Sequence, residues 1–526
     1  MSPLTARTKQ RSADDRPRPS RWRWLLFRLA AMLLGLLPLV AAEIALRAFD
    51  VGRPTDYDDP FVGFSDIHPL FISNEEQGRY EIAKSRLSHF RPDSFRAEKP
   101  SNEFRIFVLG GSTVQGRPWS IETSFTTWLE LGLNAADPSR QWEVVNCGGI
   151  SYATYRLVPI MQEVLAYQPD LIIFCEGHNE FLEDRTYGNI KTVPPALSWP
   201  QRQVTRLRTY TVLREGVLRL TGQSANSLEQ SSDKASESRP VLGPETDAML
   251  DWKGGMANYH RDPQWQANVL AHFAFNLGRI ADIAEQADVP LLIVSPVSNL
   301  EWPPFKPEHK DGITTAERKQ FDDLLKAASE KYREGPTQAL EPLLRARAID
   351  DQHALVHHQI GICQKELLQF EEAEKSLIRA KDLDVCPLRM LERFKQALHA
   401  SAAETDTPLL DAHALIAEHS RSGFPDNQWL VDHVHPTVEG HQLIADAIVT
   451  KMAELCHVHP EPKWEQANEV TYRDHLKSLD HAYFQRGQTF LDAEQRWAHG
   501  FADKERPVLR RPAKDAPVPS PSSDTD

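Results

Sequence analysis

The sequence predicts a three-layer α/β/α sandwich around a parallel sheet of five strands. Short apolar runs alternate along the chain with segments of helical periodicity. A strand that is apolar along its whole length is buried on both faces, as in a parallel sheet covered by helices. Right-handed crossovers with one switch between the first and third strands give the order 2-1-3-4-5, which we expect here.

Five apolar runs supply the predicted strands: Arg105–Leu109, Trp142–Asn146, Asp170–Cys175, Pro290–Val294 and Pro408–Asp411. Four helical segments lie between or after them: Phe125–Asn134, Tyr155–Tyr167, Trp265–Ala287 and Val438–Leu455. On the last helix Ile444, Ile448 and Met452 recur every four residues, which indicates one buried face. The fifth strand follows the fourth only after a long interruption of this alternation.

Composition limits the class of protein. The chain has 526 residues, of which 41% are hydrophobic and 25% charged, so it can bury a sizeable core. Its formal net charge of −14 argues against nucleic acid as a partner, because phosphate binding requires a basic surface. A mean hydropathy of −0.47 excludes a protein with many membrane spans. The cysteines form no C-x-x-C pair, so we expect buried free thiols and no disulfide framework: Cys147, Cys175, Cys363, Cys386 and Cys456.

The N-terminus has the composition of a membrane anchor or an export signal. Residues 1–23 hold seven basic and two acidic residues, and residues 24–42 are apolar except for Arg28. At about 1.5 Å per residue this run just crosses a hydrocarbon core of about 30 Å. The positive-inside rule then places the basic arm in the cytoplasm and the remaining chain outside it. The alternative is a cleaved signal peptide, since the small residues that end the run resemble a cleavage site.

Several stretches lie outside the predicted sheet. Polar, low-complexity composition predicts a disordered loop at 223–239, and Pro- and Ser-rich composition predicts a disordered tail at 506–526. The other parts that we expect are a basic cytoplasmic arm (1–23), a transmembrane anchor or signal sequence (24–42), a lead or linker (43–103), the first part of the α/β domain (104–314), a helical insertion (315–387), the second part of that domain (388–456) and a C-terminal helical extension (457–505).

The helical insertion carries an internal repeat. Ala339, Leu343, Arg345, Ala346 and Asp350 recur 34 residues later as Ala373, Leu377, Arg379, Ala380 and Asp384. A period of 34 with small residues seven apart resembles the tetratricopeptide repeat, although His357 and Val385 stand where Trp and Pro are usual. The alternative is a helical hairpin whose alanines let two helices approach closely. Two repeats are few for a solenoid, so we expect them to pack on the sheet domain and to offer a surface to a protein partner.

Polar motifs gather where predicted strands end, which is where open parallel sheets bind ligands. Three follow strands, and the fourth precedes the last helix: Gly110-Gly111-Ser112-Thr113, Asn146–Tyr152, Gly177-His178-Asn179-Glu180 and Asp432–Pro436. Ser112 begins a predicted helix, where it is either a nucleophile or an N-cap. Asp432 and His435 are three apart in a turn and can hydrogen-bond to each other. A neutral imidazole held in this way can take the proton of a serine hydroxyl.

Together these motifs resemble the SGNH (GDSL-like) hydrolase superfamily, whose sequence blocks run in this order on these elements, in a flavodoxin-like fold. The resemblance covers roughly Arg105–Gly188 and Pro290–Leu455, without the helical insertion. It implies that Ser112 is the nucleophile, His435 the general base and Asp432 the residue that orients the base. It also implies an oxyanion hole made of the backbone N–H groups of Ser112 and Ser151 and the side chain of Asn179.

The motifs depart from the usual superfamily pattern in three places. Gly110-Gly111-Ser112 stands where Gly-Asp-Ser is usual. Ser151 stands where the second block commonly has Gly, and Glu180 where Asp is frequent. Because a backbone donor tolerates a change of side chain, Ser151 still fits an oxyanion hole. The N–H of Gly148 or Gly149 is the alternative donor.

The resemblance implies a serine esterase that hydrolyses carboxylic esters, such as O-acyl groups on envelope glycans or lipid esters. We expect a single-pass membrane protein with its catalytic domain on the periplasmic side or, after signal cleavage, a secreted one. Two alternatives stay open: an O-acyltransferase with the same three residues, and a non-catalytic protein that binds through its repeats. Asp432, His433, His435 and His441 are candidate metal ligands, but no other Asp/His cluster completes such a site, so we expect no metal and no cofactor.

Overall fold

The computed structural model describes most of the chain between residues 69 and 498. The described residues are 21–49, 51, 63–64, 69–182, 207–210, 212–213, 241–242 and 255–498. Contacts within the chain define two units: one joins Met1–Asp58 to Val193–Ala235, and the other joins Asp59–Thr192 to Ser236–Asp526. The predicted disordered loop and tail, and most of the predicted basic arm, lie outside the described residues.

The first unit contains the helix α1 (Arg21–Ala48), which holds the predicted apolar run 24–42. Near its C-terminal end, Glu43 pairs with Arg47 and accepts a hydrogen bond from the N–H of Thr209 at 2.9 Å. In the part of the chain that the structure describes, no helix is long and apolar enough to cross a membrane. The membrane anchor, the signal peptide and the resulting localisation therefore stay predictions.

The second unit is built on the predicted parallel sheet. Its strands are β5 (Glu103–Gly110), β6 (Gln141–Gly148), β7 (Leu171–Cys175), β9 (Leu291–Ser295) and β10 (Leu409–Asp411). All neighbouring strands pair in parallel, and their order in space is β10-β9-β7-β5-β6. Numbered along the chain this order is 2-1-3-4-5, so the predicted fold class and strand order are confirmed. The carboxyl ends of the strands share one edge, which brings the motifs that follow them together.

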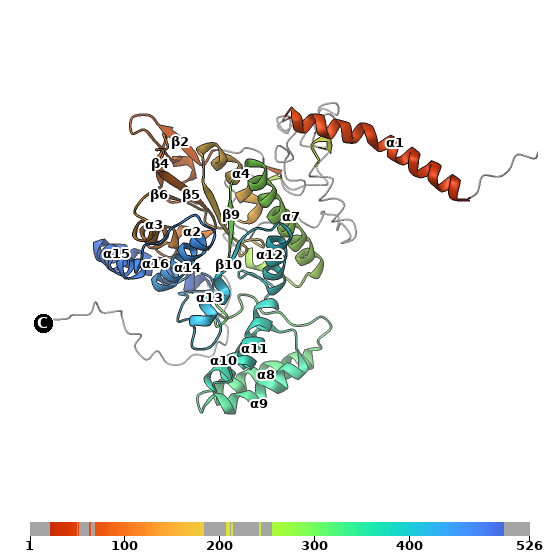
Figure 1. Cartoon of the computed structure of the whole chain (residues 1–526). Helices are drawn as coiled ribbons and strands as arrows, with labels where there is room; N and C mark the ends of the chain where they lie inside the picture. The colour runs from red at the N-terminus through yellow and green to blue at the C-terminus, as the bar shows by residue number, and fades with distance from the viewer. Residues whose placement is uncertain are drawn as a thin grey trace, which may run out of the picture. The chain divides into compact units, whose positions relative to one another are not determined.

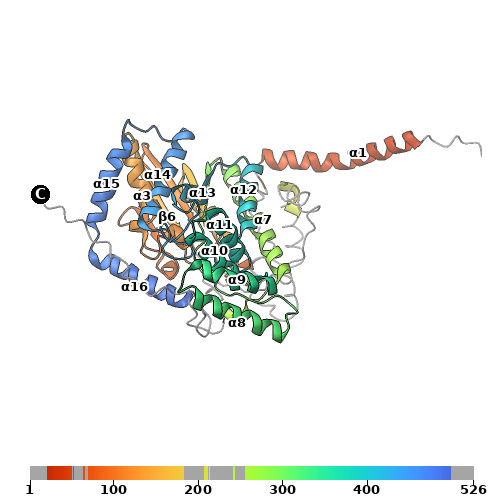
Figure 2. The ribbon, with the colours of Figure 1, turned by 90° about the horizontal axis from the view of Figure 1, so that it is seen from below.

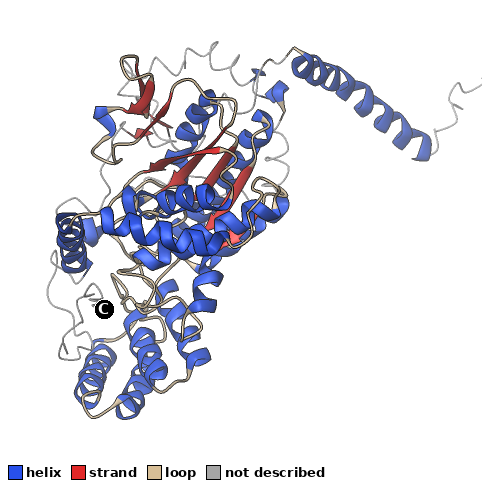
Figure 3. Cartoon of the chain, turned by 60° about the vertical axis from the view of Figure 1, so that its left-hand side comes forward, coloured by secondary structure: helices blue, strands red, loops and turns tan. Residues whose placement is uncertain are grey.

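Helices cover both faces of this sheet (Figures 1 and 3). One face packs on α4 (Thr154–Val164), α7 (Pro263–Ala287) and α12 (Glu392–Glu404). The other packs on α2 (Ser112–Gln115), α3 (Phe125–Ala136), α13 (Ala412–His419) and α14 (Val438–Glu454). Along β5, Phe107 and Leu109 belong to the first core, whereas Ile106 and Val108 belong to the second. This alternation explains why both sides of the strand are apolar.

The predicted lead or linker 43–103 contains a small sheet that the sequence did not reveal. β2 (Phe71–Asn74), β3 (Arg79–Ile82) and β4 (Ser94–Arg96) pair in antiparallel fashion. Phe71 and Phe95 are buried in the first core, with ring centroids 5.0 Å apart. Strands of three or four residues are too short to show a hydrophobic period, which is why this segment resembled a linker. A two-residue parallel pair joins β1 (Gly63–Phe64) to β8 (Val241–Leu242).

The insertion between β9 and β10 is helical. Its helices are α8 (Thr315–Lys331), α9 (Pro336–Ile349), α10 (Ala354–Glu366) and α11 (Phe370–Asp382), and each packs on the next. The repeated residues Ala339 and Ala373 are fully buried. A Cβ on Gly361 would lie 2.6 Å from Leu377 Cγ, so α10 and α11 approach closely. Close helical hairpins fit both interpretations of the repeat, and the tetratricopeptide assignment stays a prediction.

Charged and apolar contacts fasten the insertion to the sheet domain. Lys365 of α10 forms ion pairs with Glu301 and Asp426, both of which lie outside the insertion. Ala373 and Leu377 of α11 share a small core with Leu300 and Phe424. The insertion therefore packs on the segments that follow β9 and precede α14.

The chain after α14 continues as α15 (Trp464–Ser478) and α16 (His481–Ala498), within the predicted extension 457–505. Figure 2 shows α15 beside α3 and α14. The Tyr472 hydroxyl donates to Trp128 O at 2.8 Å, and the two rings lie 4.8 Å apart. On α16, the Tyr483 and Thr123 hydroxyl oxygens lie 2.8 Å apart. These contacts tie the C-terminal helices to the sheet domain.

Candidate active site

The first motif places Ser112 at the junction of β5 and α2. Ser112 is the first residue of α2, Gly111 is its N-cap, and the serine is half-buried. A Cβ on Gly110 would lie 2.3 Å from Cys175 O and from Val114 Cγ2, so only glycine fits where the strand turns into the helix. The tight turn leaves the serine hydroxyl at the carboxyl edge of the sheet, where a ligand can reach it.

The fourth motif brings Asp432 and His435 to this hydroxyl. Both lie in the loop before α14, which an antiparallel bridge between Leu430 and Pro436 closes. Ser112 Oγ lies 2.7 Å from His435 Nε2, and His435 Nδ1 lies 2.6 Å from Asp432 Oδ2. Asp432 and His435 are 0% and 3% exposed, respectively. The three residues form one hydrogen-bonded chain from a half-buried hydroxyl to a fully buried carboxyl group.

The charge of Asp432 decides where the protons of this chain lie. Burial alone would raise the pKa of its carboxyl group, but the rings of His435 and His433 and hydrogen bonds from His435 and the Val434 N–H hold that pKa well below its ordinary value. The ionised carboxylate therefore accepts from His435 Nδ1–H. A neutral His435 then carries its lone pair on Nε2, toward the Ser112 hydroxyl. This tautomer is the one that a general base requires.

Asn299, which the sequence did not single out, holds the Asp432 loop from the end of the neighbouring strand β9. Its side-chain amide donates to Asp432 O at 2.7 Å and to Asn427 Oδ1 at 2.8 Å. Its backbone N–H donates to His433 O at 2.9 Å. Arg389, which follows the insertion, in turn donates to Asn299 O at 2.8 Å. The signal in the sequence is a lone asparagine shortly after a predicted strand, which is too weak to suggest this role.

The third motif places Asn179 beside the Ser112 turn, and the second motif approaches that turn through Gly149, two residues before Ser151. Ser151 has a φ of 61°, a left-handed conformation that favours glycine. Asn179 Nδ2 donates to Tyr152 O at 3.1 Å and lies 2.5 Å from where a Cβ on Gly111 would be. A side-chain amide has two N–H groups. One N–H of Asn179 therefore remains for a ligand beside Ser112.

The alternative donors of the second motif are already used. The N–H of Gly148 donates to Asn146 Oδ1, and the N–H of Gly149 donates to Gly110 O, both at 2.9 Å. Among the hydrogen bonds of the described residues, none engages the N–H of Ser112 or Ser151. These two N–H groups and the Asn179 amide are therefore the candidate donors for an oxyanion. Their role stays a proposal.

Two buried carboxyl groups to which the sequence assigned no role flank Asn179. Glu176 is 2% exposed, and its Oε1 accepts hydrogen bonds from the N–H groups of the next three residues at 2.9–3.0 Å. Glu180 accepts from the N–H and the hydroxyl of Thr154 at 2.8 and 3.0 Å. Burial raises the pKa of Glu176 to about 7 and that of Glu180 to about 8, although these hydrogen bonds act in the opposite direction. The signal in the sequence for Glu176 is that an acidic residue directly follows an apolar strand.

The two further histidines of the hypothetical metal site have other surroundings. His433 packs on Phe305, with ring centroids 5.0 Å apart, and burial lowers its pKa to about 4 despite the nearby Asp432. His441 is fully buried, and its Nδ1 accepts from the N–H of Phe125 at 3.2 Å. Within the described residues, no three His, Cys, Asp or Glu side chains are grouped so as to hold a metal ion.

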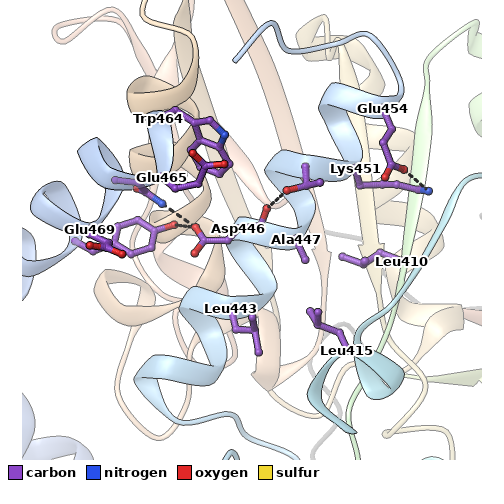
Figure 4. A pocket seen from close by; sticks show the side chains of 13 residues that line it. Leu410, Leu415, Leu443, Asp446, Ala447, Lys451, Glu454, Trp464, Glu465 and Glu469 are labelled. Atoms are coloured by element: carbon purple, nitrogen blue, oxygen red, sulfur yellow. Dashed lines mark hydrogen bonds and ion pairs between the residues drawn. The ribbon is translucent and has the colours of Figure 1, made fainter. Parts of the chain in front are cut away.

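A cavity of about 480 Å³ lies between β10, α13, α14 and α15 (Figure 4). Leu443 lines it from α14, whereas Trp464, Glu465 and Glu469 line it from α15. Asp446, also on α14, accepts a hydrogen bond from Asn468 Nδ2 at 2.7 Å. The lining residues belong to none of the four motifs, so we do not assign this cavity to the active site.

No protein-family model matches the sequence, and no curated protein matches it. Several solved structures do. A lipase/acylhydrolase from Enterococcus faecalis aligns at 11% identity over 68% of this chain and 99% of its own, with a TM-score of 0.30. An acetylxylan esterase from Geobacillus stearothermophilus, solved as a catalytic mutant, aligns at 12% identity over 66% and 94%, with a TM-score of 0.30. An α/β hydrolase from the metagenome of Lake Arreo aligns at 12% identity over 66% and 95%, also with a TM-score of 0.30.

Identities and TM-scores this low carry no functional argument, so the function must be derived from the site itself. Two of these neighbours are named as an acetylxylan esterase and a lipase/acylhydrolase, and the name of a further one places it in the G-D-S-L family. What this chain supplies independently is the order of its motifs and the order of its strands. In both respects the chain is similar to the GDSL/SGNH-like hydrolases.

Proposed function

We propose that the protein is a serine esterase that hydrolyses carboxylic esters. The observation that supports this function is the chain Ser112–His435–Asp432, with contacts of 2.7 and 2.6 Å. A serine hydroxyl is a weak nucleophile until a neutral imidazole takes its proton, and a carboxylate must hold that imidazole in the correct tautomer. The three side chains meet these requirements at the edge of the sheet where ligands bind.

In the first half of the reaction, Ser112 Oγ attacks the carbonyl carbon of the ester while His435 Nε2 takes the hydroxyl proton. Asp432 stays ionised and stabilises the imidazolium. The tetrahedral intermediate then collapses, the bond to the alcohol oxygen breaks, and the imidazolium gives its proton to the leaving alcohol. In the second half, His435 takes a proton from water, whose oxygen attacks the acyl carbon. The bond from that carbon to Ser112 Oγ then breaks, the acid leaves, and the imidazolium returns the proton to Ser112.

The negative charge on the carbonyl oxygen has three candidate donors: the N–H groups of Ser112 and Ser151 and the side chain of Asn179. Each donor of this kind contributes about 10²–10³ to the rate, because it is aimed at charge that exists only in the transition state. The two backbone N–H groups have no other acceptor among the described residues. They are thus ready for an oxyanion without breaking an internal hydrogen bond.

The substrates that we propose are O-acyl groups on envelope glycans or lipid esters. Ser112 is half-buried at an open sheet edge, which suits an acyl group presented on a larger molecule. The predicted N-terminal anchor would place the site among such molecules. Transfer of the acyl group to a sugar hydroxyl instead of water is the second candidate, because both acceptors use the same acyl-enzyme.

A series of p-nitrophenyl esters, with and without a polyol acceptor, tests the proposal on the purified protein. We expect ester hydrolysis that chelators leave unchanged, and stoichiometric labelling of Ser112 by a fluorophosphonate probe, located by peptide mapping. An acylated polyol that accumulates faster than the free acid would identify a transferase. The absence of both hydrolysis and labelling would contradict the proposal. It would favour a binding protein that uses its helical insertion.

We also propose that the activity is extracytoplasmic. The basis is the basic arm 1–23 followed by the apolar run 24–42. N-terminal sequencing of the mature protein and cell fractionation test this address. A membrane-bound protein that starts near residue 1 supports an anchor, and a protein that starts at Glu43 supports a cleaved signal peptide. A full-length protein in the cytosol would contradict both.

A further inference from the structure

The carboxyl group of Glu176 connects two turns that come from different strands. Its Oε1 accepts from the N–H groups of Gly177, His178 and Asn179, and its Oε2 lies 2.3 Å from where a Cβ on Gly111 would be. The first three residues form the turn after β7, whereas Gly111 belongs to the nucleophile turn after β5. One buried side chain therefore lies against residues on both sides of the proposed acyl site.

Gly111 is a glycine for lack of space rather than for its backbone conformation. Its φ of −88° and ψ of −152° are accessible to any residue. A Cβ at this position would lie 2.3 Å from Glu176 Oε2 and 2.5 Å from Asn179 Nδ2, far inside van der Waals contact. The space in which a side chain at position 111 would begin is already filled by the carboxyl group of Glu176.

We infer that Glu176 is a positioning residue that takes the place of an aspartate at position 111. The first motif reads Gly-Gly-Ser where Gly-Asp-Ser is usual, and the carboxyl group arrives instead from the end of the neighbouring strand. By packing against Gly111 and accepting from the N–H of Asn179, it sets the distance between the Ser112 turn and the side-chain donor of Asn179. The inference rests on the proposed function, since it assigns these two turns a shared oxyanion.

Reciprocal exchange of the two side chains tests the inference. We compare Glu176→Ala, Gly111→Asp and the double variant in kcat, KM and thermal stability. Either single change should lower kcat by about 10–10²-fold with little change in KM, because a misplacement of about 1 Å costs about 10² in rate. Gly111→Asp should also lower Tm, because its Cβ meets the carboxyl group of Glu176. The double variant should exceed both single variants in kcat and in Tm.

Two further variants separate positioning from general stability. Glu176→Gln keeps an acceptor oxygen, so it should retain at least about 10-fold more activity than Glu176→Ala. Glu163 is the matched control, since it accepts from the N–H groups of Leu70 and Phe71 at 2.7 and 2.8 Å and belongs to none of the four motifs. Glu163→Gln should lower Tm without changing kcat, and should not rescue Gly111→Asp.

The outcomes keep the inference distinct from the proposed function. Losses that simply add in the double variant, in both kcat and Tm, would overturn the inference even if the wild type is an active esterase. If the wild type neither hydrolyses esters nor is labelled at Ser112, the proposed function fails. The Tm values of the wild type, the two single variants and the double variant then still decide whether position 111 and Glu176 compete for one carboxyl site.

Discussion

Asp432 and Glu176 are two buried carboxyl groups that are held in the same way but differ in charge. Each lies in a turn and accepts N–H groups from the residues that follow it: Asp432 Oδ1 accepts two at 2.8 Å, and Glu176 Oε1 accepts three at 2.9–3.0 Å. Only Asp432 also accepts from an imidazole, that of His435, among the described residues. The pKa of Asp432 lies well below its ordinary value, whereas burial raises that of Glu176 to about 7.

The difference indicates that hydrogen bonds from backbone N–H groups alone do not offset the rise in pKa that burial causes in a carboxyl group here. A neighbouring imidazole does, because it can become positively charged and thereby favour the carboxylate. Asp432 is therefore suited to stabilise an imidazolium, and Glu176 to hold two turns in place. The predictions that follow test this division of roles, from the largest expected effect to the smallest.

Ser112→Ala removes the hydroxyl group at one end of the hydrogen-bonded series Asp432–His435–Ser112. We expect kcat/KM for p-nitrophenyl acetate to fall by about 10⁶-fold, the scale seen when a catalytic triad acts as a unit. The fold should persist, because the lost hydroxyl has its contact with His435 at the half-buried edge of the site. Circular dichroism and Tm verify the fold. A loss of less than about tenfold would show that another group performs the attack.

Asp432→Asn tests the charged member of the pair of carboxyl groups. The amide cannot favour the Nδ1–H tautomer of His435 as a carboxylate does, so we expect kcat to fall by about 10⁴-fold with the fold intact. In the wild type, kcat/KM should fall as the pH is lowered, since the base must be neutral to take the serine proton. A flat pH–rate profile down to about pH 5 would contradict a histidine base.

Asn179→Ala changes the turn that Glu176 holds. We expect kcat to fall by about 10²–10³-fold, because one donor of the oxyanion is lost while the two backbone donors remain. KM should change little, since the charge that this donor stabilises develops only in the transition state. An effect on KM alone would mean that Asn179 binds the ground state and would remove it from the oxyanion hole.

Glu180→Gln extends the comparison to a third buried carboxyl group, and it is measured through stability instead of rate. Burial raises the folded-state pKa of Glu180 to about 8 from an ordinary value of 4.5, so its contribution to stability is complete below about pH 4.5 and is lost as the pH rises toward 8. The variant should therefore lose less stability than the wild type between pH 5 and pH 8.5 in urea unfolding. Equal losses in the two proteins would show that Glu180 does not carry a raised pKa.

Much of the sheet was predictable because each strand is a short apolar run with its own signal. The positions of Ser112 and of Asp432 and His435 followed from their places beside predicted strands and helices. Glu176 did not, because its role depends on register: β5 and β7 pair Gly110 with Cys175, which brings the next residue of each strand together. Connection rules predict that two strands are neighbours. A strand that is apolar on both faces, as β5 is, does not define its offset from the next strand by its hydrophobic pattern. Asn299 escaped prediction for a similar reason, since its partners lie in a loop distant in sequence.

The helical insertion has a consequence for the order in which the molecule folds. β10 pairs with β9 across the whole insertion, Leu409 opposite Ile293, and such distant pairing is slow because the intervening loop must first close. The insertion shortens that loop, since its two ends meet where the N–H of Val385 donates to Lys306 O at 3.2 Å. His435 lies beyond β10, so a nascent chain that has completed only β5 to β9 holds the serine but no base. Hydrolytic activity would thus begin only when nearly the whole chain has been made.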